Sequence, residues 1–323
     1  MKLKNRAIFT SALMLFTGMQ MLLDIRPVDA AETQSAGVYV FKDAKKDGTV
    51  TFTKKWKDNK DNDERQIPDI EISTAKPEGM IVKYKVTFHG NGLAFDDGTT
   101  ENEMTYTENG QVLDGQYKMP SGTNVCWYTD TSYKNRVVVA NDGTLNTEIT
   151  RNIDLYAKEA TFVLKSGDDI NELIPDEASA VYFTNEVMPD NATAIDVDDD
   201  GDCGVTAWMD GSVMKISTQI NDVKAIANVN SRNMFNCKSI SVLDLSSFNT
   251  AKVTTMDYAF YACHGMTTLI LGENFKFVGD TYSIPLSSWI NSNGEMFESD
   301  GTNSNLPNNV ADIYKKNVAK DLR

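Results

Sequence analysis

Two stretches near the C-terminal end share one pattern of apolar and polar positions. Residues 234–245 recur loosely as residues 259–271, and the last two leucines of each stretch lie 26 residues apart. A repeat of this length predicts stacked turns, because a single turn cannot bury its apolar side alone. Residues 215–228 carry a weaker copy, which we expect to form the turn before the first clear repeat. The residues expected to point into the stack are Leu243, Leu245, Phe248, Val253, Met256 and Phe260.

The chain has four cysteines, Cys126, Cys203, Cys237 and Cys263. The alignment of the two copies pairs the last two of them. Cys237 and Cys263 are 26 residues apart, whereas Phe235 and Phe260 are 25 apart, which places a one-residue gap before Cys237. Stacked strands are about 4.8 Å apart, so a disulfide between equivalent positions is sterically conceivable. Cysteine is also small and apolar enough to stack inside a turn, and we expect free buried thiols at this pair.

Alternating runs of apolar and polar residues predict strands throughout the front half of the chain. Residues 37–41, 48–53 and 69–73 have this pattern. Residues 84–89 form a further run that ends at a turn rich in Gly and Asn, and residues 152–158 close the segment. The chain is therefore expected to be mainly β.

The first 30 residues have the three parts of a secretory signal peptide. Basic residues at positions 2, 4 and 6 precede an apolar stretch over residues 7–23, and small residues stand at positions 28 and 30. The rest of the chain has no second apolar run long enough to span a membrane, so cleavage is expected to leave an exported protein without membrane insertion. A retained anchor is the alternative. We expect a secreted or cell-surface location.

Charge narrows the range of partners. The chain has 46 acidic against 31 basic residues and a formal net charge of −15. Such a surface repels nucleic acid and anionic lipid, so we expect no nucleic-acid partner. A hydrophobic content of 41% is that of a folded protein.

The repeat region resembles the BspA-like leucine-rich repeat proteins. Residues 243–250 read Leu-Asp-Leu-Ser-Ser-Phe-Asn-Thr and residues 253–256 read Val-Thr-Thr-Met, which is close to the repeat of that family. The resemblance runs over residues 208–314, and the segment to 323 would complete a C-terminal cap. It implies a short leucine-rich-repeat solenoid, whose end segments must cover the stack.

A second resemblance covers residues 84–159. The segments 127–130, Trp-Tyr-Thr-Asp, and 155–158, Leu-Tyr-Ala-Lys, are similar to those of the Listeria-Bacteroides repeat, the internalin B-repeat type of module. Cys126 and Glu159 depart from that family's usual Gly and Trp. The expected organisation is a signal peptide (1–30), an N-terminal β segment (31–83), this module (84–159), a connecting region (160–207) and the leucine-rich repeat domain (208–323). The expected fold class is mainly β, with small β-rich modules followed by a short solenoid.

One acidic run is a weak candidate for a calcium loop. Asp196, Asp198, Asp200 and Asp202 occupy positions 1, 3, 5 and 7 of such a loop, with Gly at position 6. Calcium loops of this type end in a bidentate Glu at position 12, where this chain has Ala207. We therefore expect a solvated acidic turn, with no metal and no cofactor.

Nucleophilic catalysis lacks a convincing base, because the chain has only two histidines. His89 is expected in an exposed turn, and His264 directly follows Cys263, so the two side chains of an extended segment would point apart. The aromatic residues Trp127, Tyr128 and Trp208 are expected in cores, whereas Tyr133, Tyr258 and Tyr261 are expected to be accessible. No enzyme activity is expected.

Both resemblances imply binding at a bacterial surface. The function we expect is that of an exported surface or secreted binding protein, which adheres to host matrix or cells through the repeat face. Its partner would be an extracellular protein or glycan, with host matrix among the candidates. The alternatives are a structural component of the cell envelope or biofilm matrix and, third, a secreted hydrolase. Both families enter by analogy alone.

Overall fold

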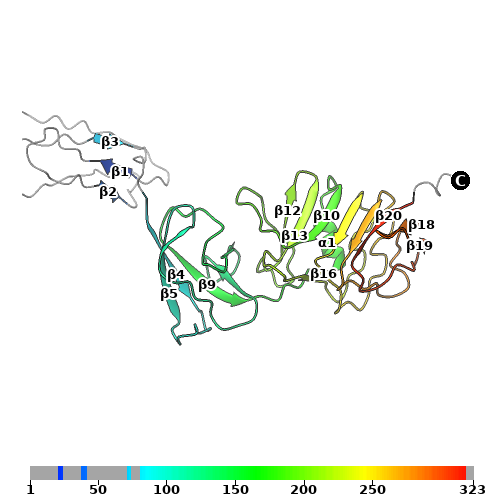
Figure 1. Cartoon of the computed structure of the whole chain (residues 1–323), viewed down its shortest axis with the longest axis horizontal. Helices are drawn as coiled ribbons and strands as arrows, with labels where there is room; N and C mark the ends of the chain where they lie inside the picture. The colour runs from blue at the N-terminus through cyan, green and yellow to red at the C-terminus, as the bar shows by residue number, and fades with distance from the viewer. Residues whose placement is uncertain (1–20, 25–37, 42–70, 74–80, 318–323) are drawn as a thin grey trace, which may run out of the picture. The chain divides into compact units, whose positions relative to one another are not determined.

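The computed structural model describes residues 21–24, 38–41, 71–73 and 81–317. The chain divides into two compact units, Met1–Val82 and Lys83–Arg323. Strands form several sheets in the described residues, and a single short helix accompanies them (Figure 1). The prediction of a mainly β chain is confirmed.

The first unit holds a three-stranded antiparallel sheet in the order β2-β1-β3. The strands are β1 (Met21–Asp24), β2 (Val38–Phe41) and β3 (Glu71–Ser73). Most of the expected signal peptide lies outside the described residues. Cleavage after position 30 would remove β1, the middle strand of this sheet.

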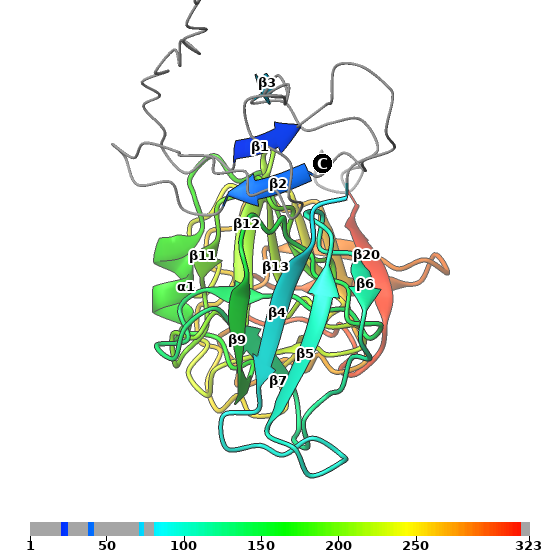
Figure 2. The same ribbon diagram turned by 90° about the vertical axis from the view of Figure 1, so that its left-hand side faces the viewer.

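The second unit begins with a six-stranded sheet in the order β6-β5-β4-β9-β7-β8. Its central strand β4 pairs antiparallel with β5 and parallel with β9, and Figure 2 shows β4 between these two. Phe88 on β4 contacts Trp127 edge to face, with 4.9 Å between the ring centroids. Aromatic rings therefore fill the core of this small sheet. Its strands are β4 (Tyr84–His89), β5 (Glu101–Tyr106), β6 (Val112–Asp114), β7 (Val125–Tyr128), β8 (Arg136–Val137) and β9 (Ile153–Glu159).

The remainder of the second unit is built on a nine-stranded sheet in the order β11-β12-β13-β10-β15-β17-β20-β18-β19. The neighbouring strands β13, β10, β15 and β17 are parallel, and the pairs toward both edges are antiparallel (Figure 1). A second ladder pairs β14 (Ala225–Ile226) with β16 (Phe248–Asn249). The strands of the large sheet are β10 (Ala180–Thr184), β11 (Ile195–Asp196), β12 (Thr206–Asp210), β13 (Val213–Ser217), β15 (Val242–Leu245), β17 (Thr268–Leu271), β18 (Ser287–Ile290), β19 (Met296–Ser299) and β20 (Asp312–Lys316).

Successive turns of chain lie against one another in register. Leu243 pairs with Leu269, and Asn230 forms a bridge to Thr255 on another side of the same turns. Buried aromatic rings also stack from turn to turn, with centroids 4.3 Å apart for Phe183 and Phe248. The six residues predicted to point inward, Leu243, Leu245, Phe248, Val253, Met256 and Phe260, are all buried. The apolar period therefore identified the core of these turns.

The turn before the first clear repeat differs from the prediction. The strand beside β15 is β10, whereas residues 213–217 lie on the far side of β10. Residues 225–226 do contact the next turn through β14. Residues 160–207, expected to be a connecting region, therefore contribute a central strand of the sheet. Residues 185–224 separate β10 from the later turns in the sequence, so the repeat pattern does not reveal that β10 pairs with β15.

Helix α1 (Gly167–Leu173) occupies one side of the turn that contains β10. Ser166 caps it by accepting a hydrogen bond from the Asp169 N–H, and acidic residues fill its first turn. Asn171 donates to the carbonyl oxygens of Asn233 and Asn236, both at 2.9 Å. A side chain at Gly167 would meet the Arg232 carbonyl oxygen at 2.1 Å. The helix is thus fixed against the following turn by direct backbone approach.

The cysteine pairing expected from the sequence is wrong in its burial. Cys263 is buried, but Cys237 is exposed, and all four cysteines are free thiols. Left-handed backbone recurs at a 25-residue interval, from φ 57° at Cys237 to φ 57° at Ala262. Cys237 is therefore structurally equivalent to Ala262. The one-residue gap in the alignment therefore belongs after Ala262. The sequence alignment placed the gap before Cys237 because it matched the two cysteines.

Candidate functional site

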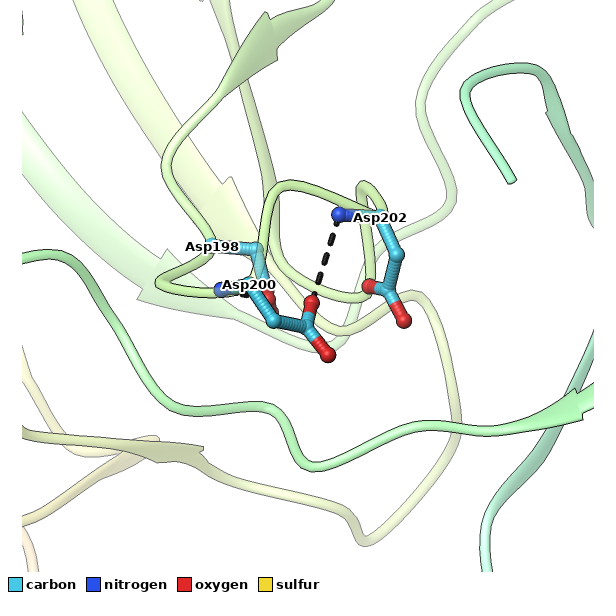
Figure 3. A group of neighbouring side chains, drawn as sticks. All are labelled: Asp198, Asp200 and Asp202. Carbon is cyan, nitrogen blue, oxygen red and sulfur yellow. Dashed lines mark hydrogen bonds between the residues drawn. The ribbon is translucent and has the colours of Figure 1, made fainter. Parts of the chain in front are cut away.

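Three aspartates gather on the loop between β11 and β12. The carboxylate oxygens of Asp198, Asp200 and Asp202 lie within 4.8 Å of one another. Each Oδ1 accepts the backbone N–H two residues further on; Figure 3 shows this bond from the Asp202 N–H to Asp200. These bonds turn the chain repeatedly and hold the carboxylates on one side. The loop conformation thus follows directly from an aspartate at every second position.

Lysines from distant segments neutralise this loop. The Nζ atom of Lys158, on β9, lies 3.1 Å from Asp200 Oδ2 and 2.5 Å from Asp202 Oδ2. Lys165 Nζ lies 3.4 Å from Asp196 Oδ1 and donates to the Asp198 carbonyl oxygen. Lys134 donates to the Gly201 carbonyl oxygen. The position between Asp200 and Asp202 therefore already has an ammonium group as its cation.

Burial perturbs the titration of the loop. Asp198 is fully buried, and burial together with the neighbouring Asp200 and Asp202 carboxyl groups raises its pKa above the usual value of 3.8. For Asp200, the hydrogen bonds from Asp198 and Lys158 outweigh burial, and its pKa is lowered. Asp198 thus holds its proton to a higher pH than Asp200, which lies beside the lysine.

The three carboxylates of this loop are ligands of the kind that calcium prefers, but they supply only part of a calcium site. Asp198, Asp200 and Asp202 lie together, but the expectation of a solvated turn is wrong for Asp198 and Asp202, which are buried. Asp196 is engaged by Lys165 and by the Asp198 N–H. Ala207, at the position of the missing bidentate ligand, is buried on β12. A divalent ion would have to displace the Lys158 ammonium group. The expectation of no bound metal stays a prediction.

The lysines were not found by sequence reasoning. Lys158 is separated from Asp202 by 44 residues, and no local pattern relates them. Arg136 makes a further contact across the same junction, where its Nη1 atom donates to the Gly204 carbonyl oxygen at 2.7 Å. These contacts connect the six-stranded sheet to the loop of the nine-stranded sheet.

The two histidines lie in unrelated environments. His89 ends β4 instead of lying in an exposed turn, and its ring stacks on Tyr156 at 4.9 Å. Its Nδ1 and Nε2 atoms face Glu101 Oε1 at 3.0 Å and Asp154 Oδ1 at 3.1 Å. Each ring nitrogen can donate to the carboxylate that it faces when it carries a proton. The sequence reading missed these cross-strand carboxylates because they lie on β5 and β9.

Cys263 and His264 do not form a pair in the described structure. The Cys263 Sγ atom donates to the Phe235 carbonyl oxygen at 2.9 Å, while His264 is exposed. Burial raises the pKa of the Cys263 thiol to about 12. Because the thiolate is the reactive form, this thiol is inert at neutral pH.

The aromatic residues divide largely as expected. Trp127, Tyr128 and Trp208 are buried in cores. Tyr258 and Tyr261 are exposed large side chains that contact each other edge to face at 6.0 Å. Tyr133 is half-buried, where its ring contacts Tyr128 at 5.3 Å.

The outer face of the large sheet carries a mixed row of side chains. Strand pairing aligns Lys215, Tyr182, Asp244, Ile270 and Ile313 across five strands. None of them is buried, whereas the residues before and after them on these strands are, apart from Asp312. This face combines an aromatic ring, both signs of charge and two isoleucines.

Comparison of the chain with family models, curated proteins and solved structures gives no match in any of the three. Within the described residues, no helix has the length and apolar character needed to cross a membrane. The residues themselves therefore carry the functional argument.

Proposed function

We propose that this chain is an exported surface or secreted binding protein, without enzyme activity, that adheres to host matrix or cells through a short leucine-rich-repeat solenoid. The observation that carries the proposal is the parallel pairing of β15 and β17, in which Leu243 meets Leu269 at the interval of the sequence repeat. Leucines lie inside and polar or aliphatic side chains lie outside, as in a repeat scaffold.

The binding surface in this proposal is the outer face of the sheet. Tyr182 pairs with Lys215 on one side and Asp244 on the other, while Ile270 pairs with Ile313. Ile313 is 43% exposed. A central aromatic and aliphatic row beside charged groups is suited to a protein partner, because buried apolar anchors supply affinity and charges supply specificity.

The test uses substitutions on this face rather than deletion of residues 208–323. Such a deletion would remove β13 and β15, the two strands that pair with β10. Purified chain with Ile313→Asp is compared with Leu113→Asp, an exposed position on β6 in the six-stranded sheet. Binding to an array of matrix proteins and mucins should fall at least tenfold with Ile313→Asp alone.

Two results would count against the proposal. Saturable binding unaffected by Ile313→Asp and by Tyr182→Ala would exclude this face. Binding only to cell-wall material or to the chain itself, measured by sedimentation at micromolar concentration, would instead favour a structural role in the envelope.

A further inference from the structure

A cleft lies within the second unit, and its lining includes none of the five residues aligned on the outer face of the large sheet. Its volume is about 620 Å³, which is within the usual range for a small-ligand site. One wall comes from residues 109–148 of the six-stranded sheet and its loops. The other comes from residues 187–190 and 219–221, on either side of the antiparallel strands β11, β12 and β13.

Carboxamide side chains line both walls of this cleft. A carboxamide places a hydrogen-bond donor and an acceptor side by side, which matches hydroxyl groups that both donate and accept. The structure assigns no intramolecular hydrogen bond to the side-chain amides of Asn109, Gln111 or Asn141, all of which are exposed. The carboxamide residues of the lining are Asn109, Gln111, Asn141, Asn146, Gln219 and Asn221.

Two of these amides are held in opposite orientations by Met188. The Oε1 atom of Gln219 accepts the Met188 N–H at 3.0 Å, which directs the Gln219 amino group elsewhere. The Nδ2 atom of Asn146 donates to the Met188 carbonyl oxygen at 3.3 Å, which leaves its own oxygen as an acceptor. Gln219 is only 7% exposed. Met188 therefore bonds the oxygen of Gln219 in the second wall and the amino group of Asn146 in the first, which leaves a donor on Gln219 and an acceptor on Asn146.

The charges of the lining disfavour an anionic ligand. Glu148 and Asp190 are acidic, and Arg136 is the one basic residue of the lining. Arg136 Nη1 is already engaged by the Cys203 and Gly204 carbonyl oxygens. Met119 and Val187, exposed by 43% and 39%, add apolar surface for the carbon face of a ligand.

From this geometry we infer that the cleft binds a neutral oligosaccharide. Hydroxyl groups of a sugar fit the carboxamides of the two walls, and its apolar face fits the aliphatic side chains. The site shares no residue with the row on the outer sheet face, and the inference does not rest on the proposed adhesion function.

The experiment uses the purified chain with N-acetyllactosamine and chitotriose as neutral probes and sialyl-N-acetyllactosamine as the anionic probe. Saturation-transfer NMR and calorimetry are expected to show saturable binding of at least one neutral sugar and at least tenfold weaker binding of the sialylated one. Gln111→Ala with Asn141→Ala should weaken the neutral sugar at least tenfold, because two partners of its hydroxyl groups are lost.

Matched variants complete the design. Gln116→Ala with Asn293→Ala removes two exposed amides outside the cleft and should leave binding unchanged. Val187→Trp should block the cleft, while Ile313→Asp should leave sugar binding intact. No binding of either neutral sugar, preference for the sialylated sugar, or binding that survives both cleft variants would overturn the inference.

Discussion

The six-stranded sheet and the stacked turns behind it hold their chains in different ways. In the six-stranded sheet, β4 and β9 bring residues far apart in sequence together, and aromatic rings close one local core. In the stacked turns, each turn pairs with the next, and one apolar cluster runs from Ala160 to Tyr314. That cluster takes only Cys126 and Tyr128 from the six-stranded sheet. A destabilising substitution should therefore loosen neighbouring turns when it lies in the turns, but should act only locally when it lies in the six-stranded sheet.

The junction between these regions combines the buried side chains of Cys126 and Tyr128 with charged contacts. Lys158, Lys134 and Arg136 extend from the six-stranded sheet to the acidic loop. Charge-assisted bonds of this kind depend on both partners, because a buried carboxylate without its cation is costly. The stability of the junction should thus depend on its charged contacts, whereas the stability of the turns should depend on the packing of their apolar side chains.

The largest effect is expected from Phe260→Ala. Phe260 is fully buried and stacks on Phe235 of the preceding turn at 5.7 Å. Its loss should destabilise the turns by about 3–5 kcal/mol. Hydrogen exchange should show amides of β15 and β17 losing protection while those of β4, β5 and β9 keep theirs.

The neighbouring Tyr261→Ala is the control for this variant. Tyr261 is 52% exposed, so its removal should change the free energy of unfolding by less than about 1 kcal/mol. Equal loss of protection in both regions after Phe260→Ala would mean that the six-stranded sheet and the stacked turns unfold as one unit.

A smaller effect is expected from Lys158→Met at the junction. The variant leaves Asp202, with a side chain only 3% exposed, without its cation. Because Lys158 is itself 27% exposed, we expect a loss of about 1–3 kcal/mol, measured by urea unfolding. Lys85→Met removes a pair with Glu103 in which both side chains are more than half exposed, and should change little. Equal losses in the two variants would contradict a buried junction.

Asp198→Asn tests the same junction through pH. The pKa of Asp198 is raised in the folded chain, so the folded state binds its proton more tightly than the unfolded state does. Its contribution to stability therefore falls as pH rises from the ordinary value of 3.8 toward neutrality. The lowered pKa of Asp200 acts in the opposite sense and below that window.

The free energy of unfolding is measured for both chains between roughly pH 5 and 7.5. As pH rises, the value for the Asp198→Asn chain should increase relative to that of the unaltered chain. The loss of one acceptor for the Val205 N–H shifts the whole curve but not its slope. Parallel pH curves for the two chains would show that Asp198 titrates at its ordinary pKa.

The sequence predicted local features better than distant ones. The apolar period found the buried residues of the turns, and the Asp spacing marked the loop of three carboxylates but not the burial of two of them. Three features that depend on contacts between distant segments were missed. They are the ion pair of Lys158, the cleft between residues 109–148 and 187–221, and the place of β10 between β13 and β15. No periodic pattern encodes these contacts. The insertion of residues 185–224 further separated β10 from the turn it belongs to.

The smallest effect tests the corrected alignment of the two repeats. Cys237 is exposed with φ 57°, a backbone region that costs non-glycine residues energy. Cys237→Gly should therefore leave stability unchanged or raise it by up to about 1 kcal/mol, since the relief of strain exceeds or balances the added freedom of the unfolded chain. Cys263→Gly should instead lower it by about 1–3 kcal/mol, because Cys263 is buried and its Sγ donates to Phe235. Calorimetric melting of both variants under reducing conditions separates the alternatives. If the cysteines were equivalent, as their 26-residue interval suggests, the two substitutions would shift the melting temperature in the same direction and by similar amounts.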